Sequence, residues 1–254
     1  MDFTTVKLMI GCPAKPAHVA VAHEQAKIAT LNLMRRHNIP VYTLPVSDCA
    51  WIGHARAALT AKFMISGATH LLMIDNDVSW KAEDVLRMLT HDVPFVGAIQ
   101  ADRKRGTFFV GRRRGGEDDE WIGGKYDEVT QLLACERLSA AFNLIRRDCI
   151  ERLMEAHPHL QAHKSAKWFM KNDVAAQPYF YGFWEQRIVD GDWPGEDHAF
   201  CDRMIDAGIP VFVDPWIELG HWVEIERYGC LGDEMKLRDG STLPNPRHEG
   251  SSAA

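Results

Sequence analysis

The chain has 254 residues, of which 46% are hydrophobic and 25% charged, a composition typical of a folded globular protein. This length suffices for one large α/β domain with a sizeable core. The formal net charge of −6 gives no overall attraction to polyanions, so any site for a nucleic acid must be local. No apolar run approaches the length of a bilayer-spanning helix, and we therefore expect no membrane span.

The six cysteines are scattered and form no Cys-x-x-Cys pair. This spacing argues against a zinc ribbon and favours free thiols in a reducing compartment. The first residues lack the charged start and apolar core of a signal peptide. The sequence therefore predicts a cytoplasmic protein.

Strands and helices alternate through the first hundred residues. Strands are expected at residues 6–12, 39–44, 71–74 and 93–99, and helices at residues 17–37, 55–66 and 82–90. In the first helix Val21, Ile28, Leu31 and Met34 form the apolar stripe that we expect to face the core. The alternation predicts βαβ units in a mostly parallel sheet, with ligands bound at the carboxyl ends of its strands.

The stretch from Thr69 to Trp80 combines a buried strand with two acids. Its four apolar residues at 71–74 show no polar alternation, as in a strand covered on both faces. Asp75 and Asp77 follow at once, where a parallel sheet binds its ligands. Two interpretations are open from these residues: a site for a hard cation such as Mg²⁺ or Mn²⁺, or a strand that ends in an Asx turn.

Residues 102–116 interrupt the acidic character of the chain. Phe108 and Phe109 lie between two basic clusters, which favours contact with phosphates and unstacked bases. The alternative is a solvated hairpin whose charge is cancelled by the four acids at 117–120. The six cations are Arg103, Lys104, Arg105, Arg112, Arg113 and Arg114.

The second half is expected to contain a hairpin at residues 121–134 about Gly123-Gly124, strands at 139–145 and 209–214, and helices at 148–156 and 199–207. Residues 157–171 are expected to be irregular. Their three histidines, at 157, 159 and 163, lack a neighbouring carboxylate or cysteine, which favours a polar surface segment over a metal site.

Glu196 and Asp197 come directly before the expected helix at 199–207. Acids in this position are ordinary helix caps, and they are also suited to act as a general base. His221 follows the last expected strand, where a single histidine is more often structural than a ligand.

Taken in order, these features resemble glycosyltransferases with the GT-A fold. The strand that ends in Asp-Asn-Asp resembles their Asp-any-Asp motif. The resemblance extends over residues 6–222 through Ala55-Arg56-Ala57, residues 94–99, residues 140–147, Gly195-Glu196-Asp197, and residues 213–221. It implies a single GT-A-like, Rossmann-type α/β domain with a mostly parallel sheet flanked by helices. It also implies a nucleotide-sugar donor, with a UDP-sugar favoured, and Mn²⁺ or Mg²⁺ as cofactor.

The resemblance also implies roles for single residues. Asp77 and His221 would bind the metal, with Asp75 on the metal or the ribose and Asn76 beside the donor. Pro13 would lie near the base, and Arg56 near the nucleotide or its diphosphate. In an inverting enzyme Asp197 would be the general base, with Glu196 as the second candidate. Ala140 and Ala141 would line the acceptor side, and Trp193 and Trp222 are candidates for stacking on a sugar or base, although a tryptophan is by default a core residue.

The expected organisation is one domain over residues 1–228, with a nucleotide-binding half at about 1–100 and an acceptor half at about 101–228, followed by a polar arm at 229–254. The expected activity is that of a hexosyl- or pentosyltransferase acting on a hydroxyl of a saccharide or protein. A first alternative is the same chemistry on a hydroxylated base in DNA, as in phage-type relatives, which the basic segment favours. Two further alternatives are a metal-dependent nucleotidyltransferase, which releases pyrophosphate, and a non-catalytic module that binds a nucleotide sugar.

Overall fold

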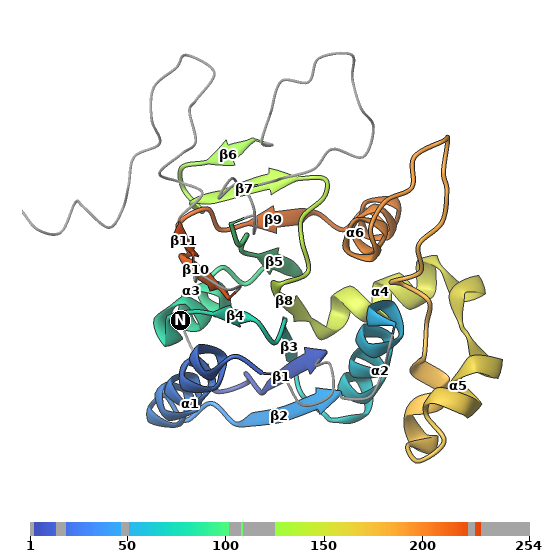
Figure 1. Cartoon of the computed structure of the whole chain (residues 1–254), viewed down its shortest axis with the longest axis horizontal. Coiled ribbons are helices and arrows are strands. Elements are labelled where there is room, and N and C mark those ends of the chain that lie inside the picture. Colours follow the sequence, from blue (N-terminus) through green and yellow to red (C-terminus); the bar gives the residue numbers. More distant parts are fainter. Residues whose placement is uncertain are drawn as a thin grey trace, which may run out of the picture.

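A computed structural model describes residues 3–13, 19–46, 51–101, 108, 125–222 and 227–229 (Figure 1). The six cations of the basic segment lie outside the described residues, as do residues 230–254 of the expected polar arm. No helix in the described part of the chain is long and apolar enough to cross a membrane.

The N-terminal part follows the expected alternation of strands and helices. Its elements are β1 (Leu8–Pro13), α1 (Val21–Arg36), β2 (Val41–Val46), α2 (Ile52–Ile65), β3 (His70–Ile74), β4 (Val78–Ser79), α3 (Ala82–Thr90) and β5 (Phe95–Gly97). The C-terminal part contains β6 (Tyr126–Asp127), β7 (Leu132–Cys135), β8 (Phe142–Arg146), α4 (Arg147–Ala156), η1 (Pro158–Leu160), α5 (His163–Phe169), η2 (Val174–Tyr179), α6 (Glu196–Asp206), β9 (Val211–Val213), β10 (Leu219–His221) and β11 (Arg227–Gly229).

The main sheet has the order β2-β1-β3-β8-β5-β9-β7-β6. β1 pairs in parallel with β2 and β3, and β5 pairs in parallel with β9. β8 runs antiparallel between β3 and β5, and β7 runs antiparallel between β9 and β6. All strands except β7 and β8 therefore point the same way, which confirms the expected mostly parallel sheet.

Helices cover both faces of this sheet (Figure 1). Leu71 and Met73 of β3 pack into a core with residues of α2, α4 and α6. Leu72 and Ile74 pack into a second core with residues of α1 and α3. Because successive strand residues face opposite sides, the uninterrupted apolar run of β3 fills both cores. The chain is thus a single α/β domain with a mostly parallel central sheet flanked by helices, as expected from its sequence.

A small second sheet, β11-β10-β4, lies beside the end of β3. β10 pairs antiparallel with β4, and His221 lies opposite Val78 in this pairing. This pairing brings a segment near residue 221 to the loop that carries the two aspartates.

The apolar stripe expected for the first helix is right at Met34, which is fully buried in the core, but wrong at its N-terminal end. Val21 and Ile28 are 74% and 55% exposed. The buried face of α1 consists of His23, Ala26, Thr30, Leu33 and Met34. The polar residues His23 and Thr30 belong to this face because they form hydrogen bonds with Val78 of β4 and with Trp80 just after it. A pattern of apolar residues does not reveal such bonds.

Three local predictions for the second half also need correction. Residues 157–171 are not irregular, since they contain η1 and α5. Within them His157 is buried, and its Nε2 bonds to the carbonyl of Arg203 at 2.9 Å. The hairpin formed by β6 and β7 turns at residues 128–131, not at Gly123-Gly124, which lie outside the described residues. Helix α6 begins at Glu196 and not at residue 199.

Candidate active site

The loop of Asp75, Asn76 and Asp77 leaves the carboxyl end of β3 with its backbone held on several sides. The amide of Asp75 donates to the carbonyl of Ala141 at 2.9 Å, which extends the pairing of β3 with β8. The carbonyl of Asn76 accepts from the amide of Ala20 at 3.0 Å, and that of Asp77 accepts from the amide of Trp222 at 2.7 Å. The two aspartates are therefore presented by a fixed backbone.

His23 of α1 completes this support and was missed by the sequence reasoning. Its Nδ1 lies 3.1 Å from the carbonyl oxygens of both Asp75 and Val78. Because carbonyls only accept hydrogen bonds, Nδ1 must carry the proton. Burial lowers the pKa of this histidine and keeps the imidazole neutral. No signal in the sequence distinguishes this histidine from the others.

Asp77 and His221 face each other across the loop. Asp77 Oδ2 lies 3.8 Å from Nε2 of His221. The other ring nitrogen of His221, Nδ1, lies 2.7 Å from the carbonyl oxygen of Ala101 and must donate to it. Nε2 is therefore left on the side of Asp77, in the arrangement by which a second hydrogen bond orients a metal-binding histidine.

Asp75 forms an ion pair with Arg56 of α2. Nη2 of Arg56 lies 2.9 Å from Oδ1 and 3.2 Å from Oδ2 of Asp75. The same nitrogen lies 3.7 Å from Oε1 of Glu196. Arg56 is 3% exposed, so its guanidinium is buried in the site and not solvated on the surface of the helix. Its Nε and Nη1 are buried and have no hydrogen-bond partner among the described residues.

The Arg56 guanidinium rests on an aromatic stack. Its Cζ lies 5.4 Å from the ring centroid of Trp184. The Trp184 ring stacks on Phe200 of α6, with centroids 3.9 Å apart and planes 4° apart. A Cβ atom on Gly53 would lie 2.8 Å from the carbonyl oxygen of Trp184. Gly53 therefore allows α2 to approach this segment closely enough for Arg56 to reach Asp75.

The acidic pair lies in the first turn of α6. Oδ1 of Asp197 accepts from the amide of His198 at 2.8 Å. A Cβ atom on Gly195 would lie 2.6 Å from this same oxygen. The glycine thus leaves room for the Asp197 carboxylate to fold back over the start of the helix.

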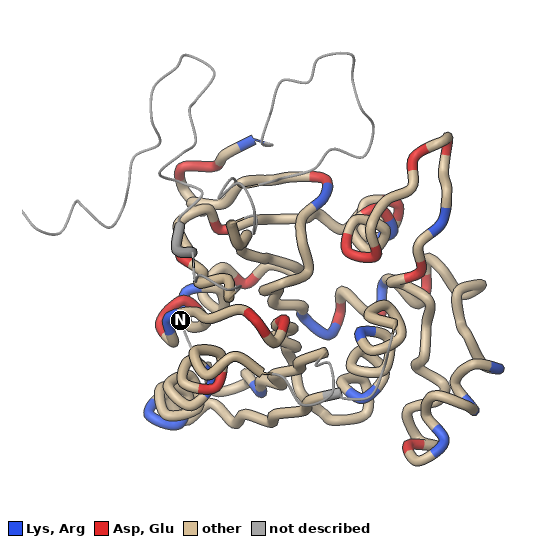
Figure 2. The backbone as a smooth tube through the Cα atoms, in the orientation of Figure 1, with Lys and Arg blue, Asp and Glu red and all other residues tan. Residues whose placement is uncertain are grey.

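These carboxylates influence one another. Burial raises the pKa of Asp75; Arg56 opposes this effect, and the charges of Asp77, Glu196 and Asp197 raise the pKa further. Figure 2 shows acidic residues (red) along α6. Asp75, Asp77, Glu196 and Asp197 together carry more negative charge than Arg56 neutralises, so a cation in this site would relieve repulsion among them.

The other residues that the sequence suggested for the site differ in their location and burial. Pro13 ends β1 beside the carboxyl end of β3. Ala140 and Ala141 are buried in the two cores. Trp193 and Trp222 are 72% and 50% exposed, so the default assignment of a tryptophan to the core is wrong for both. The cysteines that the structure describes, at 12, 135, 149 and 201, are free and buried.

The acidic loop after β3 and the acidic start of α6 thus meet at the carboxyl end of β3, in a single α/β domain with a mostly parallel sheet. No family model matches the sequence, and no curated protein matches it either.

Among solved structures, similar chains include A197 from STIV (12% identity, TM-score 0.48, 86% of both chains covered). A second is a glycosyltransferase involved in the glycosylation of the major capsid of PBCV-1 (10% identity, TM-score 0.33, 66% of this chain and 74% of that one). A third is TarS of S. aureus (12% identity, TM-score 0.37, 82% of this chain and 35% of that one). Similarities of this size carry no information about substrate or reaction.

Proposed function

We propose that the protein is a metal-dependent glycosyltransferase that moves a sugar from a nucleotide-sugar donor to an acceptor hydroxyl. The observation that carries this proposal is the Asp77–His221 pair at the carboxyl end of β3, 3.8 Å apart, with Nδ1 of the histidine bonded to the carbonyl of Ala101. A UDP-sugar is the donor we favour. The acceptor is a hydroxyl of a saccharide or of a protein.

The chemistry of the Asp77 and His221 donor atoms fits a divalent cation such as Mn²⁺ or Mg²⁺. Bonds of about 2.1 Å to each atom can bridge a separation of up to about 4.2 Å, and the observed one is 3.8 Å. No cluster of three or more acidic, histidine or cysteine side chains suited to a metal occurs in the described ranges, so water and donor phosphate would complete the coordination. A bound cation would neutralise the charge that develops on the leaving diphosphate.

Arg56 and Asp75 would act together on the donor. The ion pair fixes the Asp75 carboxylate, which then offers an acceptor to the ribose hydroxyls or a further oxygen to the cation. The free Nε and Nη1 hydrogens of Arg56 are buried donors without partners among the described residues, which suits an anionic group of the donor. Asn76 and Pro13 lie at the same edge and would complete the nucleotide side.

Asp197 would remove the proton from the acceptor hydroxyl as the sugar is transferred, provided that the reaction inverts configuration. The hydrogen bond from the His198 amide orients one oxygen of its carboxylate. Glu196, 3.7 Å from Arg56, is the second candidate for this role.

The test is calorimetric binding of UDP-sugars with and without Mn²⁺, compared between the native chain and Asp77→Asn. We expect Mn²⁺ to increase donor affinity for the native chain and to have no effect on Asp77→Asn. Asp92→Asn is the control, because Asp92 lies before β5 and its side chain is 66% exposed.

Two results would contradict the proposal. If the donor affinity of the native chain does not depend on Mn²⁺, the protein does not use a metal to bind its donor. Release of pyrophosphate from a nucleoside triphosphate, without hydrolysis or transfer from any nucleotide sugar, would make the protein a nucleotidyltransferase.

A further inference from the structure

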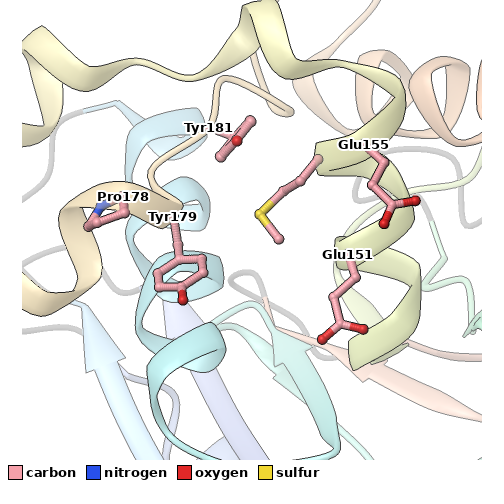
Figure 3. Close-up of a pocket in the computed structure, with 6 residues that line it drawn as sticks. Glu151, Glu155, Pro178, Tyr179 and Tyr181 are labelled. Carbon is pink, nitrogen blue, oxygen red and sulfur yellow. The ribbon is translucent and has the colours of Figure 1, made fainter.

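A pocket of about 450 Å³ lies between α4 and the chain that follows α5 (Figure 3). The pocket is open to solvent, and its volume falls in the range of small-molecule sites. None of its lining residues belongs to the site around Asp75. They are Glu151, Met154, Glu155, Pro178, Tyr179 and Tyr181.

One wall of the pocket carries two negative charges in unfavourable positions. Glu151 and Glu155 are one turn apart on α4, where like charges repel. Glu155 also lies in the last turn, which the helix dipole makes unfavourable for an acid and which holds no basic residue. The intervening Arg152 donates to the carbonyl of Gly208 at 3.0 Å. Neither glutamate forms an ion pair within the described part of the chain.

The opposite wall is aromatic. Figure 3 shows Tyr179 and Tyr181 on one side of the pocket and the two glutamates on the other. The Tyr181 ring stacks on buried Phe183, with centroids 5.0 Å apart and planes 21° apart. A β-bridge to Gln161 fixes the backbone of Tyr181. Neither phenol hydroxyl has a hydrogen-bond partner among the described residues.

We propose that this pocket binds an organic cation, an ammonium or guanidinium group on an alkyl chain, as in the side chains of lysine and arginine. The two carboxylates attract and bond such a group, and tyrosine faces stabilise it further. Met154 and Pro178 offer apolar surface to the alkyl stem. An anion would be repelled by the two carboxylates, and a neutral ligand would gain no charge interaction with them.

The test follows the methyl resonance of Met154 by NMR at low salt. N-acetyl-lysine methylamide is titrated against N-acetyl-norleucine methylamide, which has a similar alkyl chain without the charge. We expect a saturable shift with the lysine compound only. The arginine analogue and cadaverine are titrated in parallel, and their relative affinities tell whether the pocket favours a protein side chain or a free polyamine.

The variant Glu151→Gln with Glu155→Gln should weaken binding roughly three- to tenfold, the range expected for two exposed ion pairs. The control, Glu83→Gln with Glu128→Gln, removes the same charge at two exposed positions elsewhere and should change affinity by less than about twofold because salt screens distant charges. Tyr179→Leu should weaken binding by roughly two- to fivefold.

An equal shift with the norleucine compound, an equal loss in both double variants, or displacement by MgCl₂ at constant ionic strength would each overturn the proposal. None of these results depends on the glycosyltransferase activity.

Discussion

Asp214→Asn should destabilise the protein by an amount that depends on pH. Asp214 follows β9, and its side chain is fully buried. Its carboxylate accepts from Nε of Arg87 at 2.5 Å, from His91 Nε2 at 2.9 Å and from the Trp216 amide at 3.0 Å. These contacts anchor the segment leading to His221 against α3.

The magnitude follows from these partners. Removing one member of a buried ion pair costs about 3–5 kcal/mol. The Arg87 side chain is 28% exposed and can recover water, and the asparagine carbonyl can keep one hydrogen bond. Both effects lower the cost, and we expect the free energy of unfolding at pH 7 to fall by about 2–3 kcal/mol.

The pH dependence has a definite sign. Burial opposes ionisation of Asp214, but the hydrogen bonds from His91 and Arg87 and the arginine charge together hold its pKa below the ordinary value. This stabilisation is complete above the pKa of an unfolded aspartate, about 4, and is lost as the pH falls through the lower folded value. In Asp214→Asn this contribution is absent at every pH.

The assay is urea unfolding of the native chain and the variant at several pH values between 7 and 2.5. The difference between the two should be greatest near pH 7 and should shrink below pH 4. A difference smaller than about 0.5 kcal/mol at pH 7, or one that stays constant down to the lowest pH, would refute the reasoning.

Three further predictions concern the neighbourhood of α6. Arg203→Met should lower the free energy of unfolding by about 2–4 kcal/mol, because Nη1 and Nη2 of Arg203 donate to two main-chain carbonyls at 2.6 and 2.8 Å. Urea unfolding measures this loss, and a loss below about 1 kcal/mol would contradict the prediction. Asp197→Asn should keep donor affinity and reduce turnover roughly 10²-fold or more. If Glu196→Gln is inactive and Asp197→Asn is active, Glu196 and not Asp197 is the general base. Gly195→Ala should reduce turnover with unchanged donor affinity, because its Cβ would displace the Asp197 carboxylate; Gly195 has φ −59°, so backbone strain does not contribute. Full activity of Gly195→Ala would show that the Asp197 position does not matter.

The sequence by itself determined the framework of this protein. The run Leu71–Ile74 contains no polar residue, and a strand of this kind is stable only where both faces are covered. The alternation of strands and helices predicted the mostly parallel sheet, and this local pattern placed Asp75 and Asp77 at the end of a strand covered on both faces. The acidic start of α6 was likewise visible from the order of residues.

Tertiary structure alone decided how these residues are used. Arg56 in the early turns of α2 suits solvent as well as a site, and only the packing of α2 on Trp184 and α6 buries it against Asp75. His23 and Thr30 lie on the buried face of α1 because each has a hydrogen-bond partner in or beside β4. The spacing of apolar residues cannot reveal such partners, because a polar residue is buried in a core only when a distant segment supplies its hydrogen bond.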